Sequence, residues 1–260
     1  MNSSSYYYKT KTNIAVKYEN IISKIIEIYN KHKNRYGYRR ITIELNTLGY
    51  KINHKTVYKI MKKYNLIGIR CKRNKKYNSY KGTVGKVASN IINRNFKTLH
   101  PYEKMFTDVT EFKIDNEKVY LSPIIDGYNG EVLTYTISQT GDLKFVLDMI
   151  DQLYKILPET SYEKIIHSDQ GFQYQHEKYY NGLKENHIVQ SMSRKGNCLD
   201  NSIVEGFFGK LKNEFFYQEK FENVSDFVNK LNDYIYYYNN ERIKTALRMS
   251  PVQYRLLNAA

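Results

Sequence analysis

The chain has 260 residues, of which 41% are hydrophobic and 26% are charged, and its formal net charge is +15. This length suits one large domain or two smaller ones, each with a packed core. No apolar run approaches the roughly 18 residues that a membrane-spanning helix needs, so we expect no membrane contact. Residues 1–13 are polar and tyrosine-rich and lack a hydrophobic signal core, which predicts a cytoplasmic protein.

Charge is distributed unevenly along the chain. Residues 1–100 hold 23 of the 41 basic residues and 3 of the 26 acidic ones, whereas residues 101–260 hold the other 18 and 23. The first part therefore carries +20 and the second −5, which add up to the net +15. Such a basic part is typical of proteins that bind nucleic acid, although a solvated basic surface is the alternative. Cys71 and Cys198 form no CxxC pair, so the sequence predicts a reducing compartment and no zinc site.

Three helices are predicted in the basic part. Residues 18–33 show apolar side chains at helical spacing, residues 38–48 precede Gly49, and Asn53 is typical of the N-cap of a helix over residues 54–65. The last of these directs four lysines outward: Lys55, Lys59, Lys62 and Lys63. Two short helices across a glycine-containing turn favour a helix-turn-helix, although any small three-helix bundle gives the same pattern. We therefore predict a DNA-binding module over residues 1–69.

The next segment has no regular hydrophobic spacing. Residues 70–97 combine lysine and arginine with asparagine, serine and glycine. This composition predicts a basic linker over residues 70–101 that becomes ordered on a phosphate backbone, with a plain solvated tether as the alternative.

Residues 102–222 alternate between strand-like and helical patterns. Strands are predicted at 104–114, 118–125 and 131–138, at Ile165 and at 188–190, and helices at 142–157, at 176–185 and around Glu205. Three antiparallel strands followed by alternating helix and strand is the order of an RNase H-like α/β fold, with a mixed five-stranded sheet and flanking helices. Residues 223–260 are predicted as a C-terminal helical extension, in which the tyrosines are interpreted as packing residues: Tyr234, Tyr236, Tyr237 and Tyr238.

Three acidic residues lie where separate elements can bring them together. Asp108 is within the first strand, Asp169 follows a short apolar strand, and Glu205 shares a helix face with Lys212, two turns later. Three carboxylates at close range cannot all stay ionised without a cation between them. Oxygen ligands without a cysteine or histidine cluster favour Mg²⁺ or Mn²⁺ over zinc. Two such ions activate the attacking oxygen and stabilise the leaving oxygen of a phosphodiester in nucleases and polymerases.

These motifs resemble those of the OrfB-type transposases of bacterial insertion sequences, which belong to the IS-three group of the DDE transposase and retroviral integrase superfamily. The matching segments, in chain order, are residues 35–40 (RYGYRR), 107–111 (TDVTE), 167–174 (HSDQGFQY), 196–197 with 200–202 (GN, DNS), 205–208 (EGFF), 211–214 (LKNE) and 237–242 (YYNNER). The 35 residues between Asp169 and Glu205 match the spacing in that family. One difference is Phe106, since the family often has tryptophan just before the first Thr-Asp pair.

The resemblance implies a transposase that frees a 3′-hydroxyl at the end of a DNA element and joins it to another strand. Asp108, Asp169 and Glu205 would be the catalytic residues and would hold two Mg²⁺ or Mn²⁺ ions. Lys212 would contact a phosphate at the reacting end, and Arg39 and Arg40 would belong to the DNA-binding module.

The resemblance also implies partners and a location. These are the element ends and target DNA, an upstream OrfA protein or an OrfA–OrfB fusion, and further copies of the transposase in a homo-oligomer on DNA, at the bacterial nucleoid. The roles of two residues near the acids stay open. For His167 the alternatives are to orient a water, to contact DNA or to pack beside its strand. For Asn201 they are to support the site or to cap the following helix.

Two other functions remain open from the sequence alone. One is a non-catalytic regulator that binds element ends, and the other is an RNase H-like nuclease that acts on RNA–DNA hybrids. Asp126 and Asp200 are interpreted as turn or cap residues rather than metal ligands. His32 and His54 are interpreted as surface or cap residues.

Overall fold

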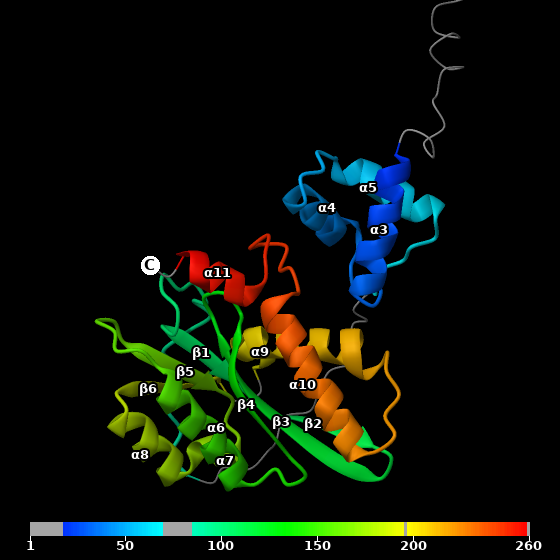
Figure 1. Cartoon of the computed structure of the whole chain (residues 1–260). Helices are drawn as coiled ribbons and strands as arrows, with labels where there is room; N and C mark the ends of the chain where they lie inside the picture. Colours follow the sequence, from blue (N-terminus) through cyan, green and yellow to red (C-terminus); the bar gives the residue numbers. More distant parts are fainter. Residues whose placement is uncertain (1–17, 70–84, 195–196, 259–260) are drawn as a thin grey trace, which may run out of the picture. The chain divides into compact units, whose positions relative to one another are not determined.

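The computed structural model describes residues 18–69, 85–194 and 197–258 (Figure 1). The chain divides into two compact units, one made of residues 1–70 with 244–248 and the other of residues 71–243 with 249–260. The finer domain boundaries drawn from the sequence stay predictions. Within the described ranges, no helix is both long enough and apolar enough to cross a membrane.

The first unit contains the three helices that the sequence predicts: α3 (Glu19–Lys31), α4 (Tyr38–Thr47) and α5 (His54–Lys63). Asn53 caps α5, because its side chain accepts a hydrogen bond from the backbone N–H of Lys55 at 2.8 Å. Gly49 follows α4 with φ +90°, a conformation that only glycine adopts without strain. Each helix contributes a fully buried side chain to the interior of this unit, namely Ile25, Ile41 and Val57, each with 0% of its surface exposed.

His32 is the C-cap residue of α3, one of its two sequence interpretations, but its ring is not at the surface. It is 2% exposed, stacks on Tyr36 with ring centroids 3.8 Å apart, and places Nε2 at 2.8 Å from a carboxylate oxygen of Glu44. A partner on the next helix thus satisfies the buried ring of this cap residue. His54, the first residue of α5, is exposed as predicted.

A mixed sheet forms the centre of the second unit. Its strands are β1 (Lys104–Thr107), β2 (Thr110–Ile114), β3 (Glu117–Asp126), β4 (Val132–Ser138), β5 (Lys164–Ser168) and β6 (Ile188–Met192). β3 pairs antiparallel with β1, β2 and β4, and the β1–β5 and β5–β6 pairs are parallel. This arrangement agrees with the predicted RNase H-like topology.

The sheet has six strands rather than five because the predicted strand 104–114 is divided into β1 and β2. Both halves pair with β3 in one continuous register, from Met105 opposite Asp126 to Ile114 opposite Glu117. Asp108 therefore lies opposite Pro123. Proline has no N–H to donate, so the ladder is interrupted at the residue that carries the first acid.

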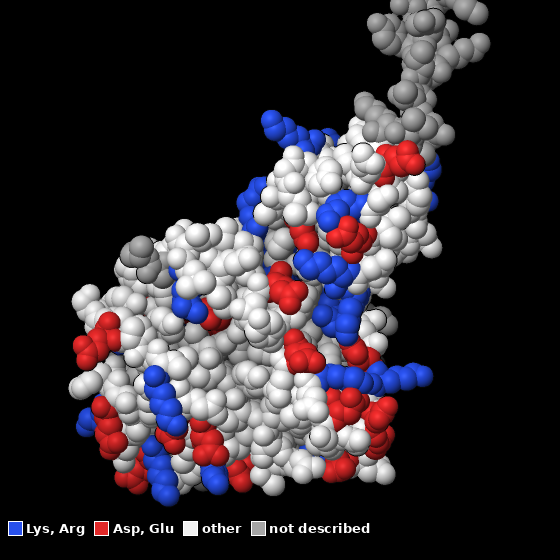
Figure 2. Space-filling model, viewed as in Figure 1, with Lys and Arg blue, Asp and Glu red and all other residues white. Residues whose placement is uncertain are grey.

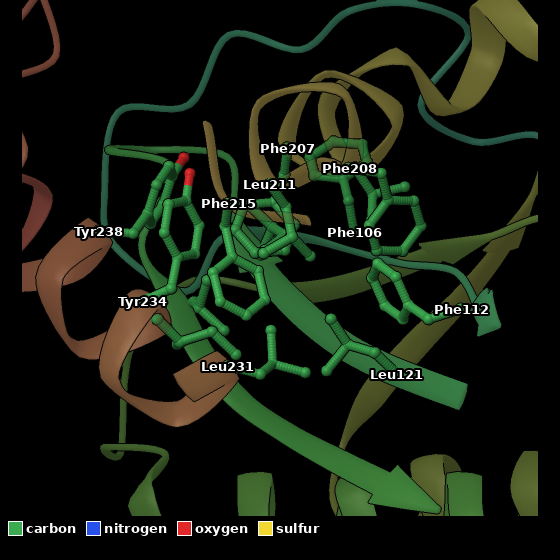
Figure 3. Close-up of a cluster of buried hydrophobic side chains, with 14 of the residues drawn as sticks. Phe106, Phe112, Leu121, Phe207, Phe208, Leu211, Phe215, Leu231, Tyr234 and Tyr238 are labelled. Atoms are coloured by element: carbon green, nitrogen blue, oxygen red, sulfur yellow. The ribbon is translucent and has the colours of Figure 1, made fainter. Parts of the chain in front are cut away.

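Helices cover both faces of the sheet (Figure 1). On one face lie α6 (Leu143–Ile156), α7 (Phe172–Gln175) and α8 (Glu177–Glu185), and on the other lie α9 (Ser202–Leu211) and α10 (Val224–Asn240). Two cores result, because neighbouring strand residues point to opposite faces: Met105 is in the α6 core and Phe106 in the α9–α10 core. Figure 3 shows the second core, in which Phe207 of α9 packs edge-on against Tyr238 of α10, with ring centroids 5.0 Å apart.

Three short elements complete the second unit. A 3₁₀ turn, η1 (Cys198–Asn201), precedes α9; a π-helical turn, η2 (Lys212–Phe216), follows it; and α11 (Pro251–Asn258) ends the described chain. Tyr234, Tyr237 and Tyr238 are buried as predicted, but Tyr236 is 65% exposed because it lies on the solvent side of α10.

The second half of the predicted linker packs along the edge of β6. The backbone N–H of Met192 donates to the carbonyl of Ser89 at 3.3 Å, and the N–H of Ile91 donates to the Ser191 hydroxyl at 3.0 Å. These residues therefore cover an open strand edge and are ordered on the protein itself rather than on a phosphate backbone. Residues 70–84, which hold most of the linker lysines, lie outside the described residues.

Candidate active site

Asp108 and Asp169 are brought together by two parallel strands. In the β1–β5 pair, Phe106 lies opposite His167, and each aspartate follows two residues later, just beyond the end of its strand. Parallel strands in register end at the same edge of the sheet, so the two carboxylates are neighbours. Both residues are half-buried. Burial and the nearby charge of Asp169 hold the pKa of Asp108 well above its usual range, and Glu205 raises it further.

The turn after β5 fixes the Asp169 carboxylate. Its Oδ1 accepts a hydrogen bond from the backbone N–H of Gly171 at 2.9 Å. A Cβ on Gly171 would lie 3.0 Å from this oxygen and 3.3 Å from the Tyr174 ring, so the turn leaves little room for a side chain. Burial raises the pKa of Asp169, and this hydrogen bond opposes the rise.

Glu205 lies in the first turn of α9, one of the two helices that cover the α9–α10 face of the sheet. Its side chain is exposed, and partial burial raises its pKa. Lys212 follows at the end of the same helix, half-buried, with Nζ 5.4 Å from the centre of the Phe112 ring. The positive charge of Lys212 lowers the pKa of Asp108. Glu205 and Lys212 therefore both act on Asp108, as expected for residues on one helix face.

Asn201 joins α9 to β1. Its Nδ2 donates to the carbonyl oxygen of Thr107 at 3.1 Å, one residue before Asp108. The Asn201 side chain makes no capping hydrogen bond to α9. Of the two roles that the sequence left open, the geometry therefore favours support of the site.

His167 lies inside the protein. It is 0% exposed, and its Nδ1 is 2.9 Å from the Ser191 hydroxyl on the neighbouring strand β6. Burial lowers its pKa to about 4, so the ring is neutral at physiological pH. This position agrees with packing beside the strand, and it leaves no access to DNA.

The donor chemistry of the three acids suits a hard divalent cation. Oxygen ligands are those that Mg²⁺ and Mn²⁺ prefer, and like charges that raise the pKa of Asp108 are relieved when a cation lies between them. In the described part of the chain, no three His, Cys, Asp or Glu side chains are already grouped to hold a metal. Glu205 is the exposed one of the three acids.

The comparisons with known proteins agree with this geometry. Residues 99–198 and 205–258 match two families described as integrase core domain, and residues 17–77 match an HTH-like domain. The putative transposase InsK for insertion sequence element IS150 of Escherichia coli is 45% identical over 255 residues, which cover 97% of this chain and 89% of the relative. The chain belongs to the transposases of bacterial insertion sequences.

Two further likenesses concern this transposase. An uncharacterized transposase-like protein of Haemophilus influenzae is 47% identical over 206 residues, which cover 79% of this chain and 94% of the relative. A chain in the simian T-cell lymphotropic virus intasome, in complex with PP2A regulatory subunit B56 gamma, has a TM-score of 0.52 at 15% identity and covers 88% of the transposase and 73% of the viral chain. The viral structure shows a shared fold.

The predicted DNA contacts of the transposase lie mainly on the surface of its first unit, from which basic side chains project in Figure 2. All four lysines of α5 are exposed: Lys55, Lys59, Lys62 and Lys63. Arg39 is exposed as well. Arg40 differs: it is half-buried, donates to the carbonyl of Arg35 at 3.2 Å, and lies 5.4 Å from the centre of the Tyr36 ring. Its guanidinium is thus partly engaged within the unit.

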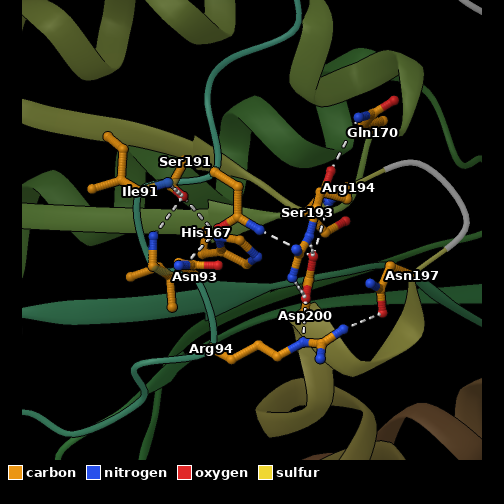
Figure 4. Close-up of polar contacts among 12 residues, drawn as sticks. Ile91, Asn93, Arg94, His167, Gln170, Ser191, Ser193, Arg194, Asn197 and Asp200 are labelled. Carbon is orange, nitrogen blue, oxygen red and sulfur yellow. Dashed lines mark hydrogen bonds and ion pairs between the residues drawn. The ribbon is translucent and has the colours of Figure 1, made fainter.

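Sequence reasoning missed two buried charged groups of the transposase. Asp200 lies in the 3₁₀ turn η1, as interpreted, but it is also fully buried and pairs with Arg94 and Arg194 (Figure 4). Glu214 and Arg242 form a second buried pair with two contacts of 2.6 Å. The motif matches at 200–202, 211–214 and 237–242 marked these acids and Arg242 but gave no sign of their partners. Asp126 is a turn residue as interpreted, since its Oδ1 accepts from the N–H of Tyr128 at 2.9 Å.

Proposed function

We propose that this transposase is a metal-dependent DDE polynucleotidyl transferase in which Asp108, Asp169 and Glu205 are the catalytic residues. It frees a 3′-hydroxyl at an element end and uses that hydroxyl to attack a second phosphodiester. The observation that carries the proposal is the strand register, which ends β1 and β5 in an aspartate at one edge of the sheet. The bond from Asn201 to Thr107 supports it, because it ties the helix of Glu205 to that edge.

The three carboxylates would hold Mg²⁺ or Mn²⁺, two ions during catalysis. When bound, the metal supplies Lewis-acid stabilisation of the attacking and leaving oxygens. The half-buried aspartates present their oxygens at a fixed edge, and the hydrogen bond from Gly171 orients the Asp169 carboxylate. Lys212 supplies a positive charge beside Asp108 that a DNA phosphate can approach.

Both steps exchange oxygens at phosphorus. In the first, a water oxygen bonds to the phosphorus at the element end, the bond to the 3′-oxygen breaks, and the leaving 3′-oxygen takes a proton. In the second, the freed 3′-hydroxyl loses its proton and attacks a target phosphodiester, which releases a new 3′-hydroxyl. No bond to the protein is needed, because the acids position and polarise the reactants.

DNA recognition belongs to the first unit in this proposal. The exposed lysines of α5, together with Arg39, would contact phosphates beside the element end, with α5 as the second helix of a helix-turn-helix. The remaining partners are an OrfA protein or an OrfA–OrfB fusion and further copies of the transposase on DNA. The protein would act in the bacterial cytoplasm, at the nucleoid.

The test uses a branched DNA that mimics a strand-transfer product, incubated with the full-length protein and Mg²⁺ or Mn²⁺. We expect end release and joining that require metal and disappear in Glu205→Gln. Glu159→Gln, which removes an exposed carboxylate from the loop before β5, should retain wild-type activity. Metal-independent joining, or joining that survives Glu205→Gln, contradicts the proposal.

If the wild-type protein gives no products, the same assay is repeated with an OrfA–OrfB fusion. DNA binding without any product from the fusion would favour the non-catalytic regulator. Cleavage confined to RNA strands of a hybrid would favour the RNase H-like nuclease.

A further inference from the structure

Two arginines from distant parts of the chain converge on the buried Asp200 (Figure 4). The Nε of Arg94 donates to Oδ1 at 2.9 Å, the Nε and Nη2 of Arg194 donate to the two carboxylate oxygens at 2.9 Å each, and the Asn90 amide adds a bond of 3.0 Å. Asp200 is 0% exposed. These donors, Arg194 first, hold its pKa well below the usual range, so the carboxylate is ionised.

The charges in this group do not cancel. Two guanidinium groups face one carboxylate, which leaves a net charge of +1. The Arg94 and Arg194 side chains are 45% and 52% exposed, although the acid between them is buried. Each guanidinium has five N–H donors. In the contacts among described residues, Arg94 uses two of them, on Asp200 and Asn197, and Arg194 uses two on Asp200. Donors therefore remain on the exposed side of both groups.

The arginine pair lies close to the candidate active site. Asp200 is followed by Asn201, whose amide is bonded to the residue before Asp108, and Glu205 is in the first turn of the helix that begins here. A site built from three acids repels the phosphates that it has to bind. Cationic groups beside the acids offset this repulsion, and Lys212 supplies one of them next to Asp108.

We propose that Arg94 and Arg194 bind a phosphodiester of the DNA that enters the active site, with Asp200 fixing the planes of their guanidinium groups. The proposal rests on the proposed function for its ligand. Arginine suits this task because its planar fork matches two phosphate oxygens, and a fork already held by a carboxylate loses little freedom on binding.

The salt dependence of DNA binding tests the proposal on the full-length protein. Binding is measured with EDTA present, so the result does not depend on catalysis. The double variant Arg94→Gln/Arg194→Gln removes the contact to one phosphodiester, which makes the slope of log K against log salt shallower by about 0.9. A fourfold rise in salt then costs the wild type about 3.5-fold more affinity than it costs the variant.

Two control variants separate this role from simpler ones. Lys155→Gln/Lys184→Gln removes the same charge from exposed positions on α6 and α8 and should leave the slope close to wild type. Arg94→Lys/Arg194→Lys keeps the charge and should keep most of the slope. The proposal is overturned if the glutamine variant matches the α6–α8 control, or if the lysine variant loses as much slope as the glutamine variant, because the arginines would then only hold Asp200.

Kinetics distinguish the source of the phosphodiester. If Arg94→Gln/Arg194→Gln has a higher KM than the wild type for an element-end duplex in 3′-cleavage, the bound phosphodiester belongs to the element end. If its KM is higher only for the target duplex, in joining with a pre-cleaved end, the phosphodiester belongs to target DNA. Either result supports the site, and an unchanged KM for both duplexes overturns it. Failure of the proposed function is distinguishable, since it would abolish products in the wild type while the slope difference in EDTA remained.

Discussion

Replacing Arg242 with methionine should destabilise the unit that contains the sheet by about 3–5 kcal/mol, the usual cost of breaking a buried ion pair from one side. Arg242 follows α10 and has 1% of its side chain exposed, and Glu214 in η2 has 5%. The Arg242 Nε and Nη2 donate to the two Glu214 oxygens at 2.6 Å each. Methionine fills much of the space but leaves a buried carboxylate, toward which Tyr234 donates at 3.3 Å.

Urea unfolding followed by far-UV circular dichroism, with calorimetry as a second probe, measures this change in the free energy of unfolding. The double variant Arg242→Met/Glu214→Gln should cost less than the sum of the single variants, by about 1–3 kcal/mol, because it removes the stranded charge. Lys230→Met is the matched control, since Lys230 pairs with Asp226 at 2.8 Å on the exposed side of α10. If Arg242→Met costs no more than Lys230→Met, or if the single costs simply add, the reasoning is refuted.

Three other positions give further predictions. Asn201→Leu should leave DNA affinity unchanged and slow single-turnover joining by about tenfold, the equivalent of one lost hydrogen bond; an unchanged rate would show that α9 is positioned by other contacts. Burial raises the pKa of Asp126 from 3.8 to about 6, so its contribution to stability is complete below pH 3.8 and is lost as the pH rises through 6. Between pH 5 and 8, the stability of Asp126→Asn relative to the wild type, measured as the free energy of unfolding, should therefore rise by about 1.4 kcal/mol; parallel urea-denaturation curves would contradict this. Pro123→Val restores a backbone donor opposite Asp108 and should slow amide exchange around it while lowering joining activity, whereas unchanged exchange would place the strand break elsewhere.

The elements with strong local patterns could be predicted closely from the sequence. The helix from Val224 to Asn240 lies in the helical extension predicted over residues 223–260, because its apolar side chains recur at helical spacing and Asn223 accepts a hydrogen bond from the N–H of Asp226 at its start. The strand before Asp169 is also visible as a short apolar run, and Asp108 lies within the strand predicted over residues 104–114. Their approach follows from the strand order, which the resemblance to integrases implied.

The polar contacts around the site could not be predicted, because their partners are distant in the sequence. Arg94 and Asp200 are 106 residues apart, and Arg94 lies in a stretch without hydrophobic spacing. The break after β1 depends on Pro123. The position of Pro123 opposite Asp108 follows only from the register between β3 and its partner strands, which the sequence does not show. Local patterns thus locate the acids but do not reveal which residues hold them in place.

The parallel pairing of β1 and β5 has a consequence for how this protein tolerates genetic change. Each aspartate is placed by the number of residues in its strand, and side-chain direction alternates along a strand. A codon change that turns Ile165 into valine leaves both carboxylates where they are. Inserting a single codon into either strand would turn its aspartate toward the opposite face of the sheet. Substitutions among the apolar residues therefore leave the two carboxylates together, whereas an in-frame insertion in either strand separates them.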